Sequence, residues 1–567
     1  MRNRWGGAEV IGAAKWEWLL PHSNRLGTRA GVALAVFALA VFLQGFFTIP
    51  PIDRDEPRFA QSTRQMLETG DYIDIRFQDS ARYKKPVGIY WLQAASVKTW
   101  QYFSGSTETR VIWPYRLPSL ISAIVSVVLT GAIGAMLFGA RAGLFAGILL
   151  AIALVMNFEA RVAKTDATLL ACVLAVQFVL AKAFLGDPDD PPLPMFERLL
   201  GWSALGLGLL VKGPVILIFV FGTLLGLVVF KEGLSWVRKL RPYSGAGIAL
   251  LIALPWIGLI TLRSQGAFLN ESVAQDLLSK IFDGATTGNI PPGFHLTAFW
   301  LGFWPGSLLV MLALPWIWAN RADRNIRFCI AWVVPAWIVF EIPLTKLLHY
   351  TLPLFPPLAM LASAWLLDGA KLLWHRYWRL FVLGVWSTVS VVLALVVTGL
   401  PVIAQEGFSF AALVLGLAVA SGLTVHRDLD RQRPARVVAS LAFAGVAFQL
   451  AVGYIVPNLS RVFLSPRIAA AAQSFTGCAD PQYVGAGFDE PSLVFLTETR
   501  IRFTDGATAA RTMAQADCII AIIRNRNEQD FLDTSAQLGV APRMIQRIDG
   551  LNIGNTRRMQ VTVYAKP

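Results

Sequence analysis

Two short runs of ionisable residues lie close together in the N-terminal part of the chain. The first, DRDEPR, occupies 53–58 directly after an apolar segment, and the second, YKKP, occupies 83–86. Lysine and arginine side chains beside a bilayer suit a phosphate held at the level of the lipid headgroups. A carboxylate nearby accepts a proton from an attacking hydroxyl or holds a polar sugar. The candidate residues in these runs are Asp55, Glu56, Arg58, Tyr83, Lys84 and Lys85.

Three further polar runs stand at the ends of later apolar segments. They are EARVAKTD at 159–166, KGP at 212–214 and KLLHY at 346–350. Charges within or against apolar segments are costly and usually functional. On the topology that the hydropathy predicts, all of these runs fall on one side of the membrane. The candidate residues here are Glu159, Arg161, Asp166, Lys212, Lys346, His349 and Tyr350.

Each candidate also has a simpler structural explanation. Asp55 before a helix would serve equally well as an N-cap, an isolated lysine such as Lys85 typically extends toward headgroups, and His349 is typical of a packed interfacial histidine. No single cap or extended lysine explains why all of them gather on one side. The joint pattern therefore predicts a site for transfer from a lipid-phosphate donor, whose departing phosphate the cations stabilise. The sequence has no His and Glu spacing typical of zinc. No cofactor is predicted, and a divalent metal stays open without a clear site.

The composition places these runs in a polytopic membrane protein. Of 567 residues, 55% are hydrophobic and 15% charged, and the mean hydropathy is +0.54. A soluble domain carries about 25% charged residues, so a soluble enzyme, a disordered regulator and a fibrous protein are excluded. The net charge of +14 is assigned to cytoplasmic loops rather than to nucleic acid. Thirteen apolar segments are predicted to cross the membrane, at 31–50, 117–137, 143–156, 167–181, 199–211, 214–230, 243–262, 296–318, 328–340, 351–367, 378–400, 409–425 and 437–456.

The basic residues predict the orientation. The loops that would face the cytoplasm hold 17 Lys and Arg residues, and the opposite short loops hold six. This asymmetry predicts a cytoplasmic N-terminus, with residues up to about Arg29 as a lead-in rather than a cleaved signal, and an outward C-terminus. The outward loop 51–116 is the exception, because it holds ten Lys and Arg residues. Long loops cross regardless of charge, and an anionic ligand would explain these cations.

The composition changes to that of a soluble domain after about Pro457. The sequence therefore predicts a transmembrane catalytic domain at 1–457 and an α/β domain at 458–567 outside the membrane. Cys478 and Cys518 both lie in the second domain, where a disulfide and two free thiols are equally consistent with the sequence. The predicted strands are 483–487, 518–523 and 561–565, and the predicted helices are 507–516 and 528–538.

Four stretches resemble, in the same order, the motifs of a known family. They are DRDEPRFAQSTRQMLETGDYIDIRFQDSARYKKPVGIYWL, EARVAKTDATLL, LGLGLLVKGPVIL and TKLLHYTLPLFPPLAML, with a weaker echo, FDEPSLVFL, in the C-terminal domain. Together they resemble the lipid A aminoarabinose transferases of the protein O-mannosyltransferase-like superfamily, and the first-loop motif is the specific one. The resemblance implies a GT-C glycosyltransferase fold: an all-α polytopic membrane protein of about 13 transmembrane helices. It also implies juxtamembrane helices within 51–116 and a small C-terminal α/β periplasmic domain.

The resemblance further implies substrates and residue roles. The donor would be a sugar on undecaprenyl phosphate or a similar polyprenyl phosphate, and the acceptor lipid A or a related glycolipid at the bacterial inner membrane, with inversion at the anomeric carbon. Asp55 and Asp166 match acidic positions and are predicted to be catalytic. Lys85, Arg58 and Lys84 are predicted to bind the donor phosphate. The residues predicted to bind substrate are Glu56, Tyr83, Glu159, Arg161, Lys212, Lys346, His349, Tyr350 and Glu490.

Two departures from the family pattern concern the sugar. Lys84 stands where the family often has an acidic residue, and the loop 263–294 has Asp276 and Lys280 where the family is rich in His and Arg. A uronic acid would fit the extra cation, so the sugar stays open among aminoarabinose, a uronic acid or a similar sugar. The alternatives are a protein O-mannosyltransferase-like enzyme and a lipid or polysaccharide transporter. The sequence shows neither ionisable groups along a path through the bilayer nor inverted repeats, which a transporter would need.

Overall fold

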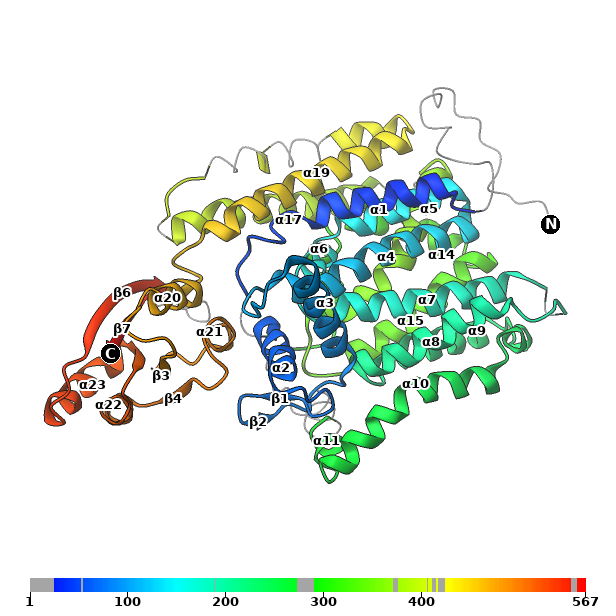
Figure 1. Ribbon diagram of the computed structural model, residues 1–567. Helices are drawn as coiled ribbons and strands as arrows, with labels where there is room; N and C mark the ends of the chain where they lie inside the picture. The colour runs from blue at the N-terminus through cyan, green and yellow to red at the C-terminus, as the bar shows by residue number, and fades with distance from the viewer. Residues whose placement is uncertain are drawn as a thin grey trace.

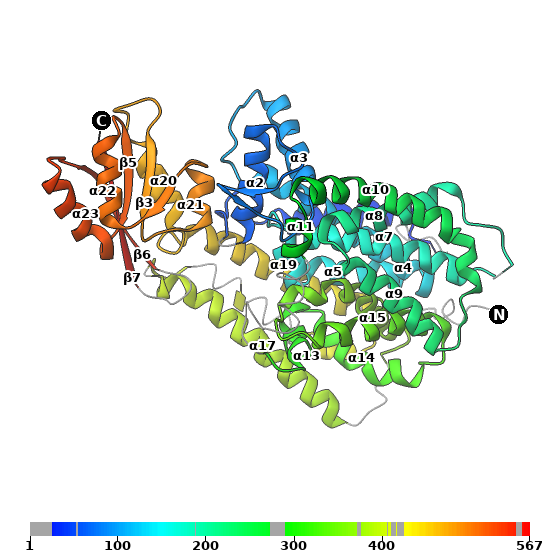
Figure 2. The ribbon, with the colours of Figure 1, turned by 90° about the horizontal axis from the view of Figure 1, so that it is seen from below.

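The computed structural model contains a large bundle of helices and a smaller domain with a β-sheet (Figures 1 and 2). Both halves of the chain contribute to the bundle core, from Leu34 to Leu459, and about the last hundred residues form the smaller domain. The structure describes residues 25–52, 55–187, 189–272, 290–370, 376–404, 406–409, 415–416, 424–551 and 558–566.

The helices of the bundle follow the apolar segments of the sequence. Twelve of the thirteen predicted segments contain one of these helices, whereas most of 409–425 lies outside the described residues, as do 1–24 and the loop positions Asp276 and Lys280. The helices are α1 (Thr28–Phe42), α4 (Trp113–Phe138), α5 (Ala140–Ile152), α6 (Leu154–Ala160), α7 (Asp166–Leu185), α8 (Met195–Lys212), α9 (Val215–Val229), α10 (Pro242–Arg263), α13 (Phe294–Gly302), α14 (Ser307–Ala319), α15 (Arg324–Glu341), α16 (Phe355–Leu367), α17 (Arg376–Ile403) and α19 (Pro434–Ile455).

The membrane character of the chain is confirmed. Among the described residues, six helical segments are long and apolar enough to cross a membrane, or seven if the bent pair α5 and α6 forms one span. The two helices of that pair meet at 67°, and α1, α9 and α14 are shorter apolar helices. The number of crossings, thirteen, stays a prediction.

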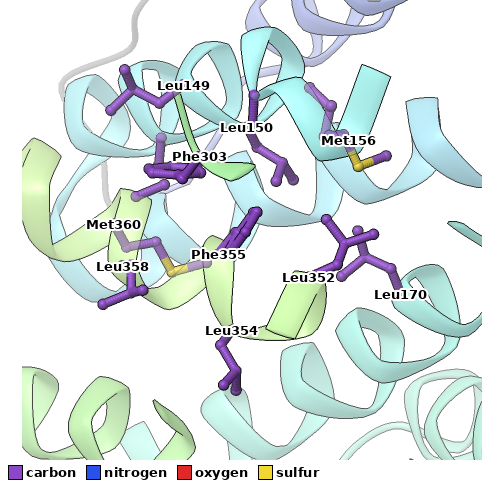
Figure 3. Packing of buried hydrophobic residues seen from close by; sticks show 14 of the residues in the cluster. Leu149, Leu150, Met156, Leu170, Phe303, Leu352, Leu354, Phe355, Leu358 and Met360 are labelled. Atoms are coloured by element: carbon purple, nitrogen blue, oxygen red, sulfur yellow. The ribbon is translucent and has the colours of Figure 1, made fainter. Parts of the chain in front are cut away.

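Small residues let the central helices approach closely. A Cβ built on Gly143 of α5 would lie 2.2 Å from the carbonyl oxygen of Gly131 in α4, so only glycine fits at this contact. The 3₁₀ helix η4 (Leu348–Leu354) is held in the same core. Figure 3 labels Leu352 of η4 with Met156 of α6 and Leu170 of α7 in one hydrophobic cluster, and all three side chains are fully buried. This packing fixes η4 against α6 and α7.

The predicted helices of the first loop are present. They are α2 (Asp55–Thr69) and α3 (Gly88–Ser104), joined through a short antiparallel hairpin of β1 (Arg76–Phe77) and β2 (Ser80–Ala81). Two acids and a proline in the first turn of α2 favour its start at that point. A Cβ on Gly88 would lie 2.8 Å from the Leu210 carbonyl oxygen, which brings α3 directly against α8.

The C-terminal domain is built on a five-stranded sheet in the order β4-β3-β5-β7-β6. Strand β3 is parallel to its neighbours β4 and β5, and β7 is antiparallel to its neighbours β5 and β6. All predicted strands and helices of this domain are confirmed. The elements are α20 (Leu464–Gln473), β3 (Gln482–Ala486), α21 (Pro491–Leu496), β4 (Arg502–Thr504), α22 (Gly506–Gln515), β5 (Ile519–Arg524), α23 (Asn525–Gln537), β6 (Arg543–Leu551) and β7 (Arg558–Lys566).

Two further features of this domain matter below. Cys478 and Cys518 form a disulfide, with their Cα atoms 6.3 Å apart, which decides the open question between a bridge and free thiols. Phe495 of α21 is fully buried against the first-loop helices, and its ring meets that of Tyr115 edge-on at 5.4 Å. The domain therefore packs against the helix that begins at Asp55.

Candidate active site

A cluster of ionisable side chains surrounds Asp166, the first residue of α7. Asp166 forms an ion pair with Lys212, the last residue of α8, and its other oxygen lies 4.0 Å from the Lys164 ammonium. The His349 Nε2 atom on η4 is 3.7 Å from the same carboxylate. Helices α7 and α8 and the turn η4, which are far apart in the chain, therefore bring their charges to one point. This convergence is the arrangement that the sequence predicts.

Glu159 of α6 supplies a second buried carboxylate to the same cluster. Its Oε1 atom lies 3.3 Å from the Lys164 ammonium and 3.6 Å from His349 Nδ1. The His349 ring thus lies between Glu159 and Asp166. The Oε2 atom of Glu159 is buried and has no hydrogen-bond partner among the residues that the structure describes. A buried carboxylate oxygen without a donor is costly, so a donor group brought by a substrate would be favourable here.

The lysines balance the buried carboxylates. Lys164 lies between α6 and α7, and although burial lowers its pKa, the charges of Glu159, Asp166 and Asp55 raise that pKa above its usual value. Lys164 therefore carries its charge at any physiological pH. The Lys212 ammonium also lies 5.6 Å from the centre of the Tyr350 ring, a cation–π contact that adds to its ion pair.

Asp55 is the solvent-accessible acid of the group. It opens α2, its side chain is exposed, and its charge acts on Lys164. Its charge also acts on the buried hydroxyl of Tyr90 in α3. The two predicted catalytic acids therefore differ: Asp166 is committed to two lysines, whereas Asp55 faces solvent and can meet a reactant.

The YKKP run lies beside this cluster. A Cβ built on Gly213 would be 4.0 Å from Cγ of Pro86, which places the run next to the end of α8 and Lys212. Gly213 has a φ of 66°, a conformation that glycine adopts without strain. Lys84 is exposed and Lys85 is half-buried, as is Arg58 on α2. The YKKP run therefore lies next to the end of α8, and the contact of its cations with a donor phosphate stays a prediction.

Tyr83 has a structural position in the same run. Its hydroxyl donates to Asp74 at 2.7 Å, and its backbone N–H donates to Glu271 at 3.2 Å. Burial, with the hydrogen bond to Asp74, raises the pKa of Tyr83 to about 12. Its hydroxyl is thus a neutral donor already used within the protein, and its role toward substrate stays a prediction.

The structure assigns Glu56 to the framework instead of to a substrate. Its two oxygens accept from Arg116 at 2.7 and 2.9 Å, from the Ile52 N–H at 2.8 Å and from the Ala163 N–H at 2.9 Å. Glu56 and Arg116 are essentially inaccessible to solvent. Four hydrogen bonds use the lone pairs that a substrate would need, so the predicted substrate contact of Glu56 is corrected to a structural one.

Arg161 and Lys346 receive the same correction. The Arg161 guanidinium donates to the carbonyl oxygens of Val41 and Phe42 at 3.0 and 3.2 Å, which satisfies the free C-terminal end of α1. The Lys346 ammonium donates to the carbonyl oxygens of Ile290 and Pro343 at 2.7 and 2.6 Å. Both side chains are buried, and each holds backbone rather than facing the cluster.

Glu490 lies in the C-terminal domain at the residue before α21, and its side chain is half-buried. Helix α21 packs against α2, so Glu490 belongs to the element that connects the C-terminal domain to the helix of Asp55. Its predicted substrate contact stays a prediction.

Two further charged residues, Arg82 and Glu271, lie near Tyr90 and are not among the predicted site residues. Burial raises the pKa of Tyr90, and the charges of Arg82, Asp55 and Glu271 act on its hydroxyl, so these four side chains are neighbours. The Arg82 guanidinium also lies 5.0 Å above the ring of Phe59. Arg82 directly precedes the YKKP run and would have been found by extending that run by one residue. Glu271 carries no such signal. Among the described residues, no three His, Cys, Asp or Glu side chains are arranged to hold a metal ion.

Comparison with known proteins shows which chains this sequence is similar to. Residues 84–258 match the family described as dolichyl-phosphate-mannose-protein mannosyltransferase. The chain is 26% identical over 363 residues to an undecaprenyl phosphate-alpha-4-amino-4-deoxy-L-arabinose arabinosyl transferase of Pectobacterium carotovorum subsp. carotovorum (strain PC1), a match that covers 62% of this chain and 61% of that one. It is 25% identical over 437 residues to the protein of the same name from Yersinia pestis (strain Pestoides F), which covers 74% of this chain and 76% of that one.

The fold agrees as well. The crystal structure of ArnT from Cupriavidus metallidurans bound to undecaprenyl phosphate matches with a TM-score of 0.73 at 19% identity, over 97% of this chain and 98% of that one. The apo form of the same protein gives a TM-score of 0.71. The resemblance indicated by the sequence motifs is confirmed: the chain is similar to the aminoarabinosyl transferases and has their GT-C fold.

Proposed function

We propose that the chain is an inner-membrane glycosyltransferase that moves a sugar from a polyprenyl phosphate to lipid A or a related glycolipid. The observation that carries the proposal is the convergence of Asp55, Asp166 and Lys212 with the YKKP run at one end of the helical bundle. The curated relatives are named as transferases that use an undecaprenyl phosphate sugar, which supports a donor of that class. On the orientation that the loop charges favour, this end and the C-terminal domain are periplasmic.

In the proposed reaction, the bond between the anomeric carbon of the sugar and the phosphate oxygen of the donor breaks. The polyprenyl phosphate leaves with the electron pair, and Lys85, Arg58 and Lys84 stabilise its charge. An acceptor oxygen attacks the opposite face of the same carbon, so the configuration inverts. Asp166 stays ionised because Lys164 and Lys212 neutralise it, and in turn it holds these lysines in place.

The role of Asp55 depends on the acceptor. An acceptor hydroxyl must lose its proton, and Asp55 is the exposed carboxylate positioned to accept that proton. An acceptor phosphate is already ionised at neutral pH and needs no base. Asp55 would then stabilise the positive charge that develops on the sugar ring.

We expect Lys85→Ala to impair use of the donor. Removal of one charge-stabilising group typically lowers the rate by about 100-fold or more, and loss of a phosphate contact also raises the KM for the donor. The measurement is sugar transfer by the purified protein over a range of polyprenyl phosphate sugar concentrations. Lys98→Ala is the matched control, because Lys98 is an exposed lysine of α3 that lies over the Tyr72 ring. Equal donor kinetics for the two variants would exclude a phosphate role for Lys85.

We expect lipid A from cells that make the protein to carry an added sugar mass that is absent from cells without it. Mass spectrometry of the extracted lipid identifies the sugar from the mass difference: a pentosamine and a uronic acid give different increments. Cells that make the Asp55→Asn variant serve as the control. If lipid A is unchanged while a protein or another glycan carries the added sugar, the acceptor is that molecule and not lipid A. A translocated but unmodified lipid would instead favour the transporter.

A further inference from the structure

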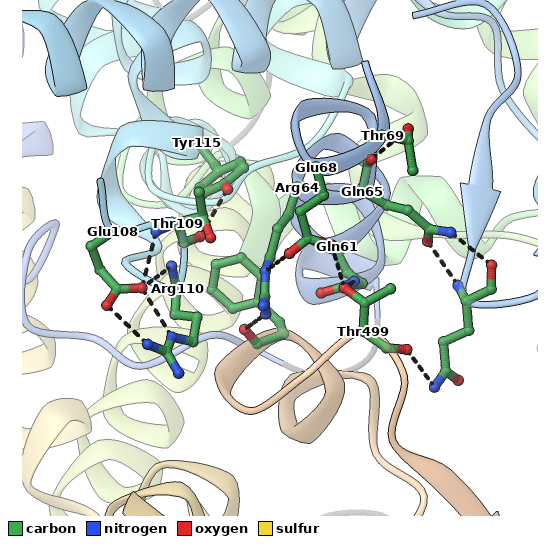
Figure 4. Close-up of polar contacts among 12 residues, drawn as sticks. Gln61, Arg64, Gln65, Glu68, Thr69, Glu108, Thr109, Arg110, Tyr115 and Thr499 are labelled. Carbon is green, nitrogen blue, oxygen red and sulfur yellow. Dashed lines mark hydrogen bonds and ion pairs between the residues drawn. The ribbon is translucent and has the colours of Figure 1, made fainter. Parts of the chain in front are cut away.

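A short segment of the C-terminal domain forms polar contacts with α2. This clamp segment, residues 495–501, consists of the last two residues of α21 and the five residues that follow them. The Thr499 hydroxyl accepts from the Gln61 side-chain amide at 2.8 Å and donates to the Glu68 carboxylate at 2.8 Å (Figure 4). Gln61 and Glu68 are two helical turns apart on one face of α2. One hydroxyl therefore spans two turns of the helix.

A charged contact reinforces this bridge. The Arg64 Nε atom donates to Glu68 at 2.7 Å, and its Nη1 atom donates to the Phe495 carbonyl oxygen at 2.9 Å. Arg64 is 7% exposed, so these bonds are little weakened by water. Apolar packing of Phe495 alone would let α2 turn about its axis. The hydrogen bonds to Gln61, Arg64 and Glu68 are directional and fix that rotation.

The hairpin between α2 and α3 completes the contact. The Gln78 side-chain amide donates to the Ile501 and Thr499 carbonyl oxygens at 2.7 and 3.2 Å. The Gln78 backbone exchanges two hydrogen bonds with the Gln65 side chain, at 2.8 and 2.9 Å. Gln78 has a φ of 55°, a left-handed conformation that is unfavourable for a residue other than glycine, asparagine or aspartate. The strained residue is therefore held where the clamp segment, the hairpin and α2 meet.

We propose that the clamp segment sets the position of Asp55 and Arg58, so that Thr499 and Gln78 are positioning residues for sugar transfer. Asp55 and Arg58 both lie in the first turn of α2, and the clamp segment contacts the same helix from Gln61 to Glu68. Because a helix of 15 residues moves as a rigid body, a rotation released at the clamped end displaces Asp55 relative to Lys164. The inference rests on the proposed transferase function.

The test compares three full-length variants with the wild-type protein in the transfer assay. Thr499→Val keeps the side-chain volume and removes both hydrogen bonds, and we expect kcat to fall about tenfold, since small misplacement of a catalytic group is costly. Thr499→Ser restores the hydroxyl and is expected to recover most of the rate. Thr508→Val is the matched control, because the Thr508 hydroxyl also binds a carboxylate, that of Asp505 at 2.9 Å, but far from α2. Hydrogen exchange of the α2 amides should rise in Thr499→Val alone.

A fourth variant distinguishes a loss of positioning from a simple loss of folding. Gln78→Gly relieves the left-handed strain while removing the amide contacts, so a purely structural role predicts unchanged or improved stability and an unchanged rate. We expect instead a lower kcat with normal thermal stability. If Thr499→Val and Gln78→Gly both transfer sugar at the wild-type rate, the clamp has no positioning role. If the wild-type protein itself transfers no sugar, the proposed function fails, and increased exchange of α2 in Thr499→Val would still show the mechanical coupling.

Discussion

Asp55→Asn is expected to abolish sugar transfer while leaving the protein folded in the membrane. Asp55 is exposed at the start of α2, and its charge acts on Lys164 and on the Tyr90 hydroxyl. Asparagine has nearly the same shape but neither accepts a proton nor offsets positive charge on a sugar ring. Because general-base catalysis contributes about 10² to 10⁴-fold, we expect kcat to fall about 1,000-fold or more. The transfer assay with purified protein measures this loss.

The control for this prediction is Asp79→Asn in the β1–β2 hairpin. Asp79 is also an exposed aspartate of the first loop, and we expect its variant to transfer sugar normally. Wild-type turnover by Asp55→Asn would remove Asp55 from the mechanism.

Glu56→Ala is expected to give the largest loss of stability of any single change at the site. It would leave the fully buried Arg116 guanidinium without its carboxylate and two backbone N–H groups, those of Ile52 and Ala163, without an acceptor. Breaking a buried ion pair from one side destabilises by about 3–5 kcal/mol. Thermal unfolding of the purified protein in detergent should therefore show a clearly lower midpoint.

Two further variants show whether the unpaired charge of Arg116 causes the loss of stability in Glu56→Ala. In the double variant Glu56→Leu with Arg116→Leu neither charge remains, and we expect part of the stability to return. Glu108→Ala breaks a pair with Arg110 in which both side chains are more than a third exposed, and we expect a change of about 1 kcal/mol or less. An equal loss for Glu56→Ala and Glu108→Ala would contradict the structural role assigned to Glu56.

The convergence of the site was predictable from sequence because each member stands at the end of an apolar segment. Asp166 begins α7 and Lys212 ends α8, and segments of membrane length place such ends at the same depth. The sequence did not separate these residues from Glu56 and Arg161. In the sequence, a charged residue that binds a ligand at a helix end cannot be distinguished from one that pairs with another part of the chain. The partner of Glu56, Arg116, is 60 residues away in the sequence.

The fold was predictable to a similar extent. Apolar runs locate the helices of the bundle because burial in lipid or protein requires them, but the 67° bend between α5 and α6 depends on packing that is distant in sequence. In the C-terminal domain, β3, β5 and β7 are apolar and were found. Strand β4 has three residues, and the edge strand β6 is largely exposed, so neither carries the hydrophobic pattern of a buried strand.

The disulfide of the C-terminal domain links the chain just before β3 to the chain just before β5. By closing a loop between residues 478 and 518, it narrows the conformations that the unfolded domain samples. Such bridges form only where thiols are oxidised. Because the same domain packs against the helix of Asp55, we expect reduction of the bridge to loosen that contact as well. A reducing environment would then weaken the transfer site without altering any of the reacting groups.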